Sequence, residues 1–243
     1  MNCPIDAAQM APLFTHELLG RHQVQYHRCP SCGLIATEEP YWLEEAYQNF
    51  YTEQDTGALA RNNLNALKLP AILALLGLTK GTLIDCGGGY GILVRLLRDK
   101  GIQAFRQDKY CPNIFAREYE AEPNLPADIL FMSEVLEHLT DPVTELTRAL
   151  NDHNCHTLLL TTTIHYAPPS LDWPYWGFPH GQHIQFHTQA SLNALACRLG
   201  LHHIPLYSDF HLLTDKPPSA TVKWLMQQRL LMIAFTLCRS VIF

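Results

Sequence analysis

A short glycine-rich stretch, Thr82–Gly91, constrains the fold of this chain more than any other part of it. It reads Thr-Leu-Ile-Asp-Cys-Gly-Gly-Gly-Tyr-Gly, so two β-prone apolar residues lead into an acid and a group of glycines. Apolar residues then recur at helical spacing from Ile92 to Leu97, which predicts an amphipathic helix. A strand, a tight turn and a helix in this order are typical of an α/β sheet that binds a ligand at the turn. The glycines let the ligand approach the backbone, and the helix amides favour an electron-rich group.

The spacing Asp-x-Gly-x-Gly-x-Gly is shorter than the dinucleotide fingerprint G-x-G-x-x-G, which disfavours a nicotinamide-dependent enzyme. It resembles motif I of the class I S-adenosylmethionine (SAM) dependent methyltransferases. The resemblance implies a Rossmann-like α/β fold, with a mostly parallel sheet and an antiparallel last strand. It also implies SAM as the cofactor, with its amino-acid end against the turn. The cofactor-binding residues expected there are Asp85, Gly87, Gly88, Gly89 and Gly91.

Composition bounds the other possibilities. With 243 residues, 47% of them hydrophobic and 16% charged, the chain can bury one α/β core with a small appendage. A net charge of −6 gives no general attraction to nucleic acid, so we expect a small-molecule partner. No signal peptide is visible near Met1, and the eight cysteines are placed as buried, reduced thiols. We therefore expect a cytoplasmic protein.

The composition also predicts four segments. Residues 1–40 form a small zinc-ribbon-like unit, and residues 41–77 form a helical connector rich in aromatic residues. Residues 78–218 form the SAM-binding domain, and residues 219–243 form an apolar C-terminal helix. The last segment has three interpretations: a helix packed on the core, a homodimer interface, or a contact with a membrane surface.

Three cysteines in the first segment predict a zinc site. Cys29 and Cys32 belong to a Cys-Pro-Ser-Cys-Gly sequence that lets two thiolates converge on one ion, and Cys3 adds a third ligand. A closed zinc site needs four ligands, and either Asp6 or His16 can complete the set, with His22 and His27 less favoured. The alternative is a ribbon without metal that packing alone holds together.

A second strand is expected over Gln103–Asp108. Asp108 follows the glycine turn by about twenty residues, where an acid at the end of a strand can accept both ribose hydroxyls. The alternative role is a surface or helix-capping aspartate. A third strand is expected near Glu118–Glu122, with the adenine contacts between Cys111 and Pro126.

The next strand, Ala127–Glu134, is apolar without alternation, as in a strand that is covered on both faces. It leads into Ser-Glu-Val-Leu-Glu-His-Leu-Thr-Asp-Pro, which resembles a motif of the small-molecule methyltransferases. The resemblance implies that Ser133 and Glu134 line the methionine end of SAM. It also places Glu134 and His138 at the catalytic centre, although His138 can equally be a hydrogen-bonding residue at a helix start. Asp141 and Pro142 are expected to begin a helix through Leu150.

After a strand over His156–Ile164, the insertion Tyr166–His180 is dense in proline and aromatic residues. We expect its Trp173, Tyr175 and Trp176 to form a wall of the substrate pocket, with His183 as general base. Helix Gln189–Leu199, capped by Thr188, and an antiparallel pair of strands over Leu201–Thr214 complete the domain.

The sequence from Gly181 to Gly200 resembles one branch of the family, whose members methylate sugars, polysaccharide ends or other small metabolites. The function expected from the sequence is therefore O- or C-methylation of such an acceptor. A non-catalytic SAM-binding module that acts in assembly or regulation is the alternative.

Overall fold

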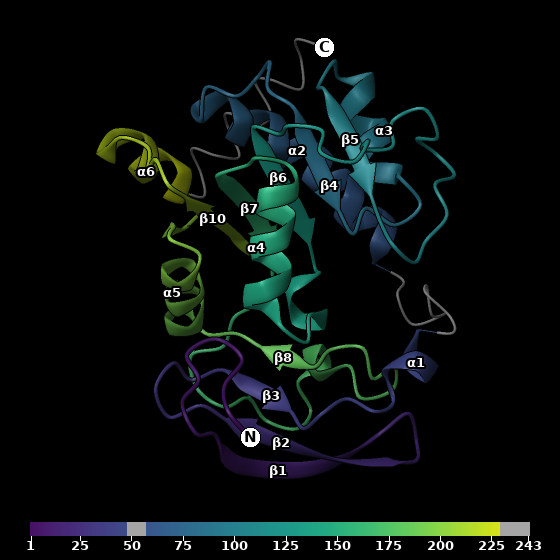
Figure 1. Ribbon diagram of the computed structural model, residues 1–243, viewed down its shortest axis with the longest axis vertical. Helices are drawn as coiled ribbons and strands as arrows, with labels where there is room; N and C mark the ends of the chain where they lie inside the picture. The colour runs from purple at the N-terminus through teal and green to yellow at the C-terminus, as the bar shows by residue number, and fades with distance from the viewer. Residues whose placement is uncertain (48–56, 229–243) are drawn as a thin grey trace. The chain divides into compact units, whose positions relative to one another are not determined.

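The computed structural model describes residues 1–47 and 57–228 (Figure 1). The chain divides into two compact units. Unit 1 draws its described residues from Met1–Asp55, Glu134–Thr147 and Thr162–Leu201. Unit 2 draws its described residues from Thr56–Ser133, Arg148–Thr161 and His202–Phe243. The N-terminal strands are therefore part of a larger compact unit that later segments of the chain complete.

Unit 2 is built on a six-stranded sheet with the order β5-β4-β6-β7-β10-β9. Its strands are β4 (Leu83–Cys86), β5 (Ala104–Gln107), β6 (Ile129–Ser133), β7 (Thr157–Thr161), β9 (His202–Pro205) and β10 (Phe210–Thr214). The first four strands in that order are parallel, and β10 is antiparallel to both β7 and β9. This confirms the expected mixed α/β fold, with a mostly parallel sheet and antiparallel strands at the end.

The helices of unit 2 are α2 (Ala58–Leu75), α3 (Ile92–Asp99) and α6 (Ala220–Gln227). Their apolar residues share one core with the sheet, because Leu69 and Leu97 from two of the helices and Phe131 from β6 are all fully buried. The strand expected near Glu118–Glu122 is wrong: only a single parallel bridge joins Glu120 to Arg106.

Unit 1 contains a four-stranded antiparallel sheet with the order β1-β2-β3-β8. Its strands are β1 (Ala11–Leu18), β2 (His22–Arg28), β3 (Ile35–Thr37) and β8 (Gln185–Phe186), and its short helices are α1 (Leu43–Ala46), η1 (Leu136–His138), η2 (Pro174–Trp176) and α5 (Gln189–Arg198). Figure 1 shows β8, in green, beside β3, in purple, although the chain passes through unit 2 between them. As expected, α5 starts at Thr188, which forms a capping box with Ser191.

Aromatic side chains form the core of unit 1. The ring of Tyr26 stacks on Phe14, with 4.6 Å between centroids, and contacts Trp176 at 5.6 Å. Trp176 is fully buried and meets Phe186 at 4.4 Å. The expectation that Trp176 forms a wall of the substrate pocket is therefore wrong, because this side chain fills the core instead.

Helix α4 (Pro142–Asp152) begins as expected, with Asp141 accepting a hydrogen bond from the Thr144 amide, and the division between the units falls inside it. Ser219 caps α6 in the same way by accepting a hydrogen bond from Val222. Residues 229–243 lie outside the described residues, so the expected roles of the tail in packing, dimerisation or membrane contact stay predictions. Among the residues that are described, no helix has both the length and the apolar character that crossing a bilayer requires.

Candidate functional site

The glycine turn after β4 is shaped by two positions that only glycine fits. Gly91 is the N-cap of α3 and has a φ of 84°, a left-handed conformation that residues with a Cβ rarely adopt. Gly88 is crowded instead, since an added Cβ would lie 2.8 Å from an Asp85 carboxylate oxygen and 3.0 Å from the Asp85 carbonyl oxygen. The turn thus brings bare backbone to the carboxyl end of a central parallel strand, where α/β sheets bind ligands.

The crowding at Gly88 gives a direct test of this turn. Replacing Gly88 with alanine should lower the free energy of unfolding by about 1–3 kcal/mol, because the new carbon has to displace the backbone of Asp85. Urea unfolding measures the difference. Gly57→Ala is the matched control, since there the added carbon meets only the flexible end of the Arg61 side chain. Equal stability of the two variants would contradict this account of the turn.

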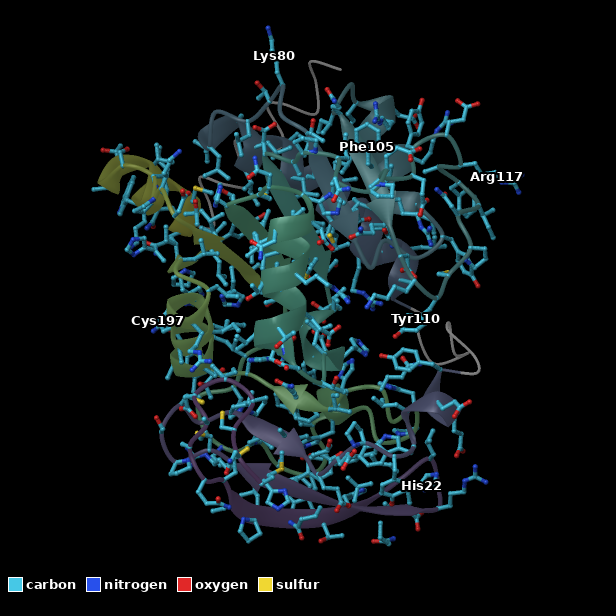
Figure 2. The ribbon with its side chains drawn as sticks, viewed as in Figure 1. His22, Lys80, Phe105, Tyr110, Arg117 and Cys197 are labelled. Carbon is cyan, nitrogen blue, oxygen red and sulfur yellow. The ribbon has the colours of Figure 1, made fainter. Side chains whose placement is uncertain are left out.

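Asp108 joins the glycine turn to the segment that follows β5. One carboxylate oxygen accepts a hydrogen bond from the Gly89 amide at 2.9 Å, and the other accepts bonds from the amides of Tyr110 and Cys111 at 2.8 and 2.9 Å. The side chain is buried. A carboxylate has about four lone-pair positions, so an acid with three amide donors retains acceptor capacity for a hydroxyl group. Tyr110 itself extends to the surface (Figure 2).

Arg106 is a buried arginine in β5 that the sequence analysis did not single out. Its side chain is 3% exposed and donates to the Gly89 carbonyl at 2.7 Å, to Glu120 at 2.7 Å and to the Cys111 carbonyl. The guanidinium also lies 3.9 Å from the Asp108 carboxylate. One arginine therefore holds both sides of the candidate cofactor loop. The signal available in the sequence was a charged residue within a short strand, two positions before the candidate ribose acid.

Asp85 is a buried acid without a direct ion pair among the described residues. Burial, and to a lesser extent the neighbouring Asp108 carboxylate, raises the pKa of Asp85 to about 7, while the charge of Arg106 opposes the shift. Its carboxyl group therefore changes charge near neutral pH, unlike an ordinary aspartate.

Ser133 and Glu134 mark the end of β6. The Ser133 hydroxyl accepts a hydrogen bond from the Asn65 amide at 2.9 Å and lies 3.2 Å from the Thr161 hydroxyl, so unit 2 fixes its orientation. Glu134, the next residue, begins the second segment of unit 1 and has a φ of 53°. A positive φ is uncommon for glutamate and costs conformational energy, and such residues are found preferentially at functional sites.

The two candidate catalytic histidines lie together in unit 1. The rings of His138 and His183 meet edge to face, with centroids 4.9 Å apart. His138 Nδ1 is 2.9 Å from the Tyr47 hydroxyl, and His183 Nδ1 is 2.6 Å from the Tyr175 carbonyl oxygen. Both histidines therefore have one ring nitrogen held by a neighbour. The same cluster contains Glu137, whose carboxylate oxygen lies within 4.8 Å of a nitrogen of each histidine.

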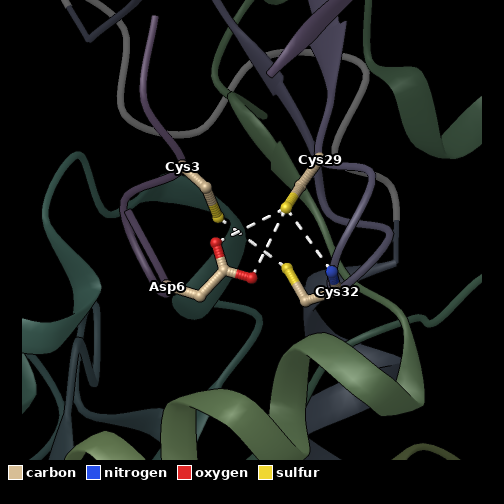
Figure 3. Close-up of side chains that lie close together, drawn as sticks. All are labelled: Cys3, Asp6, Cys29 and Cys32. Carbon is tan, nitrogen blue, oxygen red and sulfur yellow. Dashed lines mark hydrogen bonds between the residues drawn. The ribbon is translucent and has the colours of Figure 1, made fainter. Parts of the chain in front are cut away.

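A second cluster lies at the N-terminal end of unit 1. Figure 3 shows the side chains of Cys3, Asp6, Cys29 and Cys32 converging on one point. The sulfurs of Cys3 and Cys32 are 3.7 Å apart, and the Cys29 sulfur lies 3.5 Å from both oxygens of Asp6. Asp6 is thus the fourth residue of this cluster, beside the three cysteines.

His16 does not join this cluster. It lies in β1, where its ring stacks on Phe178 with 3.7 Å between centroids and its Nδ1 contacts the Glu17 carbonyl oxygen. His16 is not among the residues whose ligand atoms lie within 4.8 Å of one another, so its position does not support the metal-ligand role expected for it.

The members of this cluster differ in how readily they ionise. The hydrogen bond with Cys32 lowers the pKa of Cys3 to about 7, and the same interaction raises that of Cys32. Burial opposes ionisation of Asp6, but hydrogen bonds from the Ala8 amide and the neighbouring thiols lower its pKa to about 2. A carboxylate and a readily formed thiolate are the forms that bind metal ions. None of the seven cysteines that the structure describes forms a disulfide.

The comparisons with known proteins agree with this fold. Residues 51–205 match the family described as "Methyltransferase domain", and because the match covers more than half of the chain, the chain belongs to that family. No curated protein matches it.

Solved methyltransferases share the architecture at low identity. One is 1,6-didemethyltoxoflavin-N1-methyltransferase from Burkholderia thailandensis, with bound 1,6-didemethyltoxoflavin and S-adenosylhomocysteine. It has a TM-score of 0.53 and 14% identity over 83% of this chain and 98% of its own. Human N-acetylserotonin methyltransferase in complex with SAM has a TM-score of 0.44 and 15% identity, over 72% of this chain and 66% of its own. Mitomycin 7-O-methyltransferase has a TM-score of 0.43 and 16% identity over 66% of this chain. This chain spans only 57% of that enzyme. At these identities the similarity concerns the fold.

Proposed function

We propose that this protein is a SAM-dependent methyltransferase that acts on a small-molecule acceptor. The observation that carries the proposal is the bond between Asp108 and the Gly89 amide, which joins the ends of two parallel strands in a chain of the methyltransferase domain family. The 1,6-didemethyltoxoflavin-N1-methyltransferase neighbour, with bound 1,6-didemethyltoxoflavin and S-adenosylhomocysteine, supports the same class of cofactor and acceptor.

In this proposal the glycine turn after β4 and the ends of β5 and β6 provide the cofactor residues. Asp85 and the glycines Gly87, Gly88, Gly89 and Gly91 shape the methionine side, Asp108 accepts a ribose hydroxyl, and Ser133 and Glu134 lie toward the sulfonium. SAM supplies a methyl group on a positively charged sulfur, which is already a strong electrophile. The protein therefore contributes mainly by positioning the reactants and excluding water.

His183 is the candidate base toward the acceptor. A carbonyl oxygen only accepts hydrogen bonds, so the contact with Tyr175 requires a proton on Nδ1 of His183 and leaves the lone pair on Nε2. That nitrogen is suited to take the proton of a hydroxyl or an acidic carbon, with His138 and Glu134 near the transferring centre. A sugar, a polysaccharide end or another metabolite fits this chemistry, as O- or C-methylation.

Calorimetric titration of the purified protein with SAM, S-adenosylhomocysteine and NAD tests the proposal. We expect heat with the first two compounds and none with NAD. Replacing Asp108 with alanine should weaken SAM binding about 10- to 100-fold, the effect of losing a charged hydrogen-bond acceptor. Asp99→Ala, at an exposed site on α3, is the control and should bind normally. Unchanged binding by the Asp108 variant would contradict its ribose role.

Turnover distinguishes the enzyme from a non-catalytic SAM-binding module. Incubation with labelled SAM and a metabolite extract should transfer label to a small molecule. Binding of SAM without transfer from any extract would favour the binding module.

We also propose that Cys3, Asp6, Cys29 and Cys32 hold a structural zinc ion. Two thiolates on a tetrahedral zinc ion, each at about 2.3 Å, are about 3.8 Å apart, and a thiolate and a carboxylate oxygen are about 3.6 Å apart. The corresponding distances are 3.7 Å between Cys3 and Cys32 and 3.5 Å between Cys29 and Asp6. Three sulfurs and one oxygen at this spacing match a closed four-ligand site.

A further inference from the structure

Glu137 is a buried acid that the proposed roles have not used. It lies in η1 and has 0% of its surface exposed. The ion pairs of Arg21, Arg95 and Arg106 are formed with other acids. Burying a carboxyl group without a cation is costly unless hydrogen bonds compensate. Hydrogen bonds therefore have to compensate for the burial of Glu137.

The carboxyl group of Glu137 fixes the segment that carries η2. Tyr175 donates its hydroxyl to one carboxyl oxygen at 2.5 Å, and Thr162 donates to the other at 3.3 Å. The Tyr175 hydroxyl also accepts a bond from the Thr163 amide at 3.2 Å. The main chain adds a link, because the Glu137 carbonyl accepts a bond from the Ile184 amide at 2.9 Å.

Tyr175 passes this constraint to His183. Its carbonyl oxygen accepts the Nδ1 proton of His183 at 2.6 Å, and the two rings lie 4.6 Å apart. Tyr175 is thus held at its hydroxyl by Glu137, while its other end orients the imidazole. Ile184, which Glu137 binds through the backbone, is the residue directly after His183.

We propose that Glu137 is a positioning residue that, through Tyr175, holds the His183 ring in the Nδ1-protonated tautomer and so presents Nε2 as its basic nitrogen. The inference rests on the proposed function, in which His183 receives the proton of the acceptor. It assigns Glu137 no contact with substrate or cofactor.

Burial and hydrogen bonding act in opposite directions on the pKa of this acid. Burial raises the pKa of Glu137, although the hydrogen bonds from Tyr175 and Thr162 oppose the shift, and burial likewise raises the pKa of Tyr175. The two oxygens of Glu137 accept the hydroxyl protons of Tyr175 and Thr162, so this acid is held by neighbouring side chains of the same segment.

Three variants of the full-length protein test the inference without a known acceptor. Long-range nitrogen–proton NMR spectra report the tautomer of each histidine, and the signal of His183 is assigned as the one missing from His183→Gln. We expect the single Nδ1–H tautomer in the wild type and in Glu137→Gln, because an amide oxygen still accepts the Tyr175 hydroxyl. Glu137→Leu, of similar volume, and Tyr175→Phe should each give a mixture of tautomers. Glu39→Gln, an exposed change in the same unit, is the control.

The outcomes distinguish failure of the positioning role of Glu137 from failure of the proposed function. A single tautomer in both Glu137→Leu and Tyr175→Phe, or a mixture in Glu137→Gln as large as in Glu137→Leu, would overturn the positioning role. If Glu137→Leu fails to fold, Tyr175→Phe decides, since it keeps the ring and the carbonyl. SAM titration is independent of this readout, so failure to bind SAM would refute the proposed function and leave the tautomer result standing.

Discussion

The double variant Cys29→Ser/Cys32→Ser should lose its bound zinc and unfold at a markedly lower urea concentration than the wild type. Both sulfurs are ligands in the proposed site, and the free energy of binding a structural zinc ion is folding free energy. Zinc binding contributes about 10 kcal/mol or more to the smallest zinc domains. We expect a loss of several kcal/mol here, because the aromatic core of unit 1 adds its own stability. Elemental analysis and urea unfolding measure the two effects.

Single variants identify the fourth ligand. Asp6→Ala should weaken zinc retention against a chelator, whereas His16→Ala should retain the metal like the wild type. Cys197→Ser is the matched control, because this cysteine is exposed on α5 (Figure 2). Absence of stoichiometric metal in the wild type would mean that the cluster is held by thiol and carboxylate hydrogen bonds alone.

Replacing Arg106 with leucine should destabilise the protein by about 3–5 kcal/mol and weaken SAM binding in whatever fraction stays folded. The estimate is the cost of removing one partner from a buried charged network. The variant leaves the Gly89 and Cys111 carbonyls without their donor and leaves Asp108 and Asp85 without a nearby positive charge. Thermal unfolding and calorimetric titration with SAM provide the two measurements.

Arg106→Lys separates charge from geometry. A lysine keeps the charge but cannot reproduce the planar arrangement of donors, so we expect most of the loss to persist. Arg95→Leu, in an exposed pair with Asp99 on α3, is the control and should change stability by less than about 1 kcal/mol. If Arg106→Leu were as stable as this control, Arg106 would not hold the loop.

The sequence predicted the parts of the fold that local patterns determine. They include the apolar run of β6, the caps at Asp141 and Thr188 and the glycine turn after β4. Each of these lies where its residue types require. The strand expected near Glu120 did not form, because its pairing with Arg106 extends over only one residue. Pairing length depends on the tertiary structure, and no local pattern reports it.

The site was less accessible to prediction for a similar reason. Spacing alone left Asp6 and His16 equivalent as zinc ligands, and only the fold separates a loop residue from one on a strand. The importance of Arg106 and Glu137 lies in bonds to distant backbone groups and hydroxyls, which no local pattern reports. The preference for His183 as a general base remains a prediction, to which the structure adds the contact between its Nδ1 and the Tyr175 carbonyl oxygen.

The pairing of β8 with β3 has a consequence for how the protein is made. During synthesis the first three strands leave the ribosome early, yet β3 keeps an unpaired edge until Gln185 and Phe186 have been added. Such late, non-local contacts slow folding and leave intermediates that are open to aggregation. A fragment that ends before β8 should therefore be prone to self-association, even though it contains every residue of the cysteine cluster.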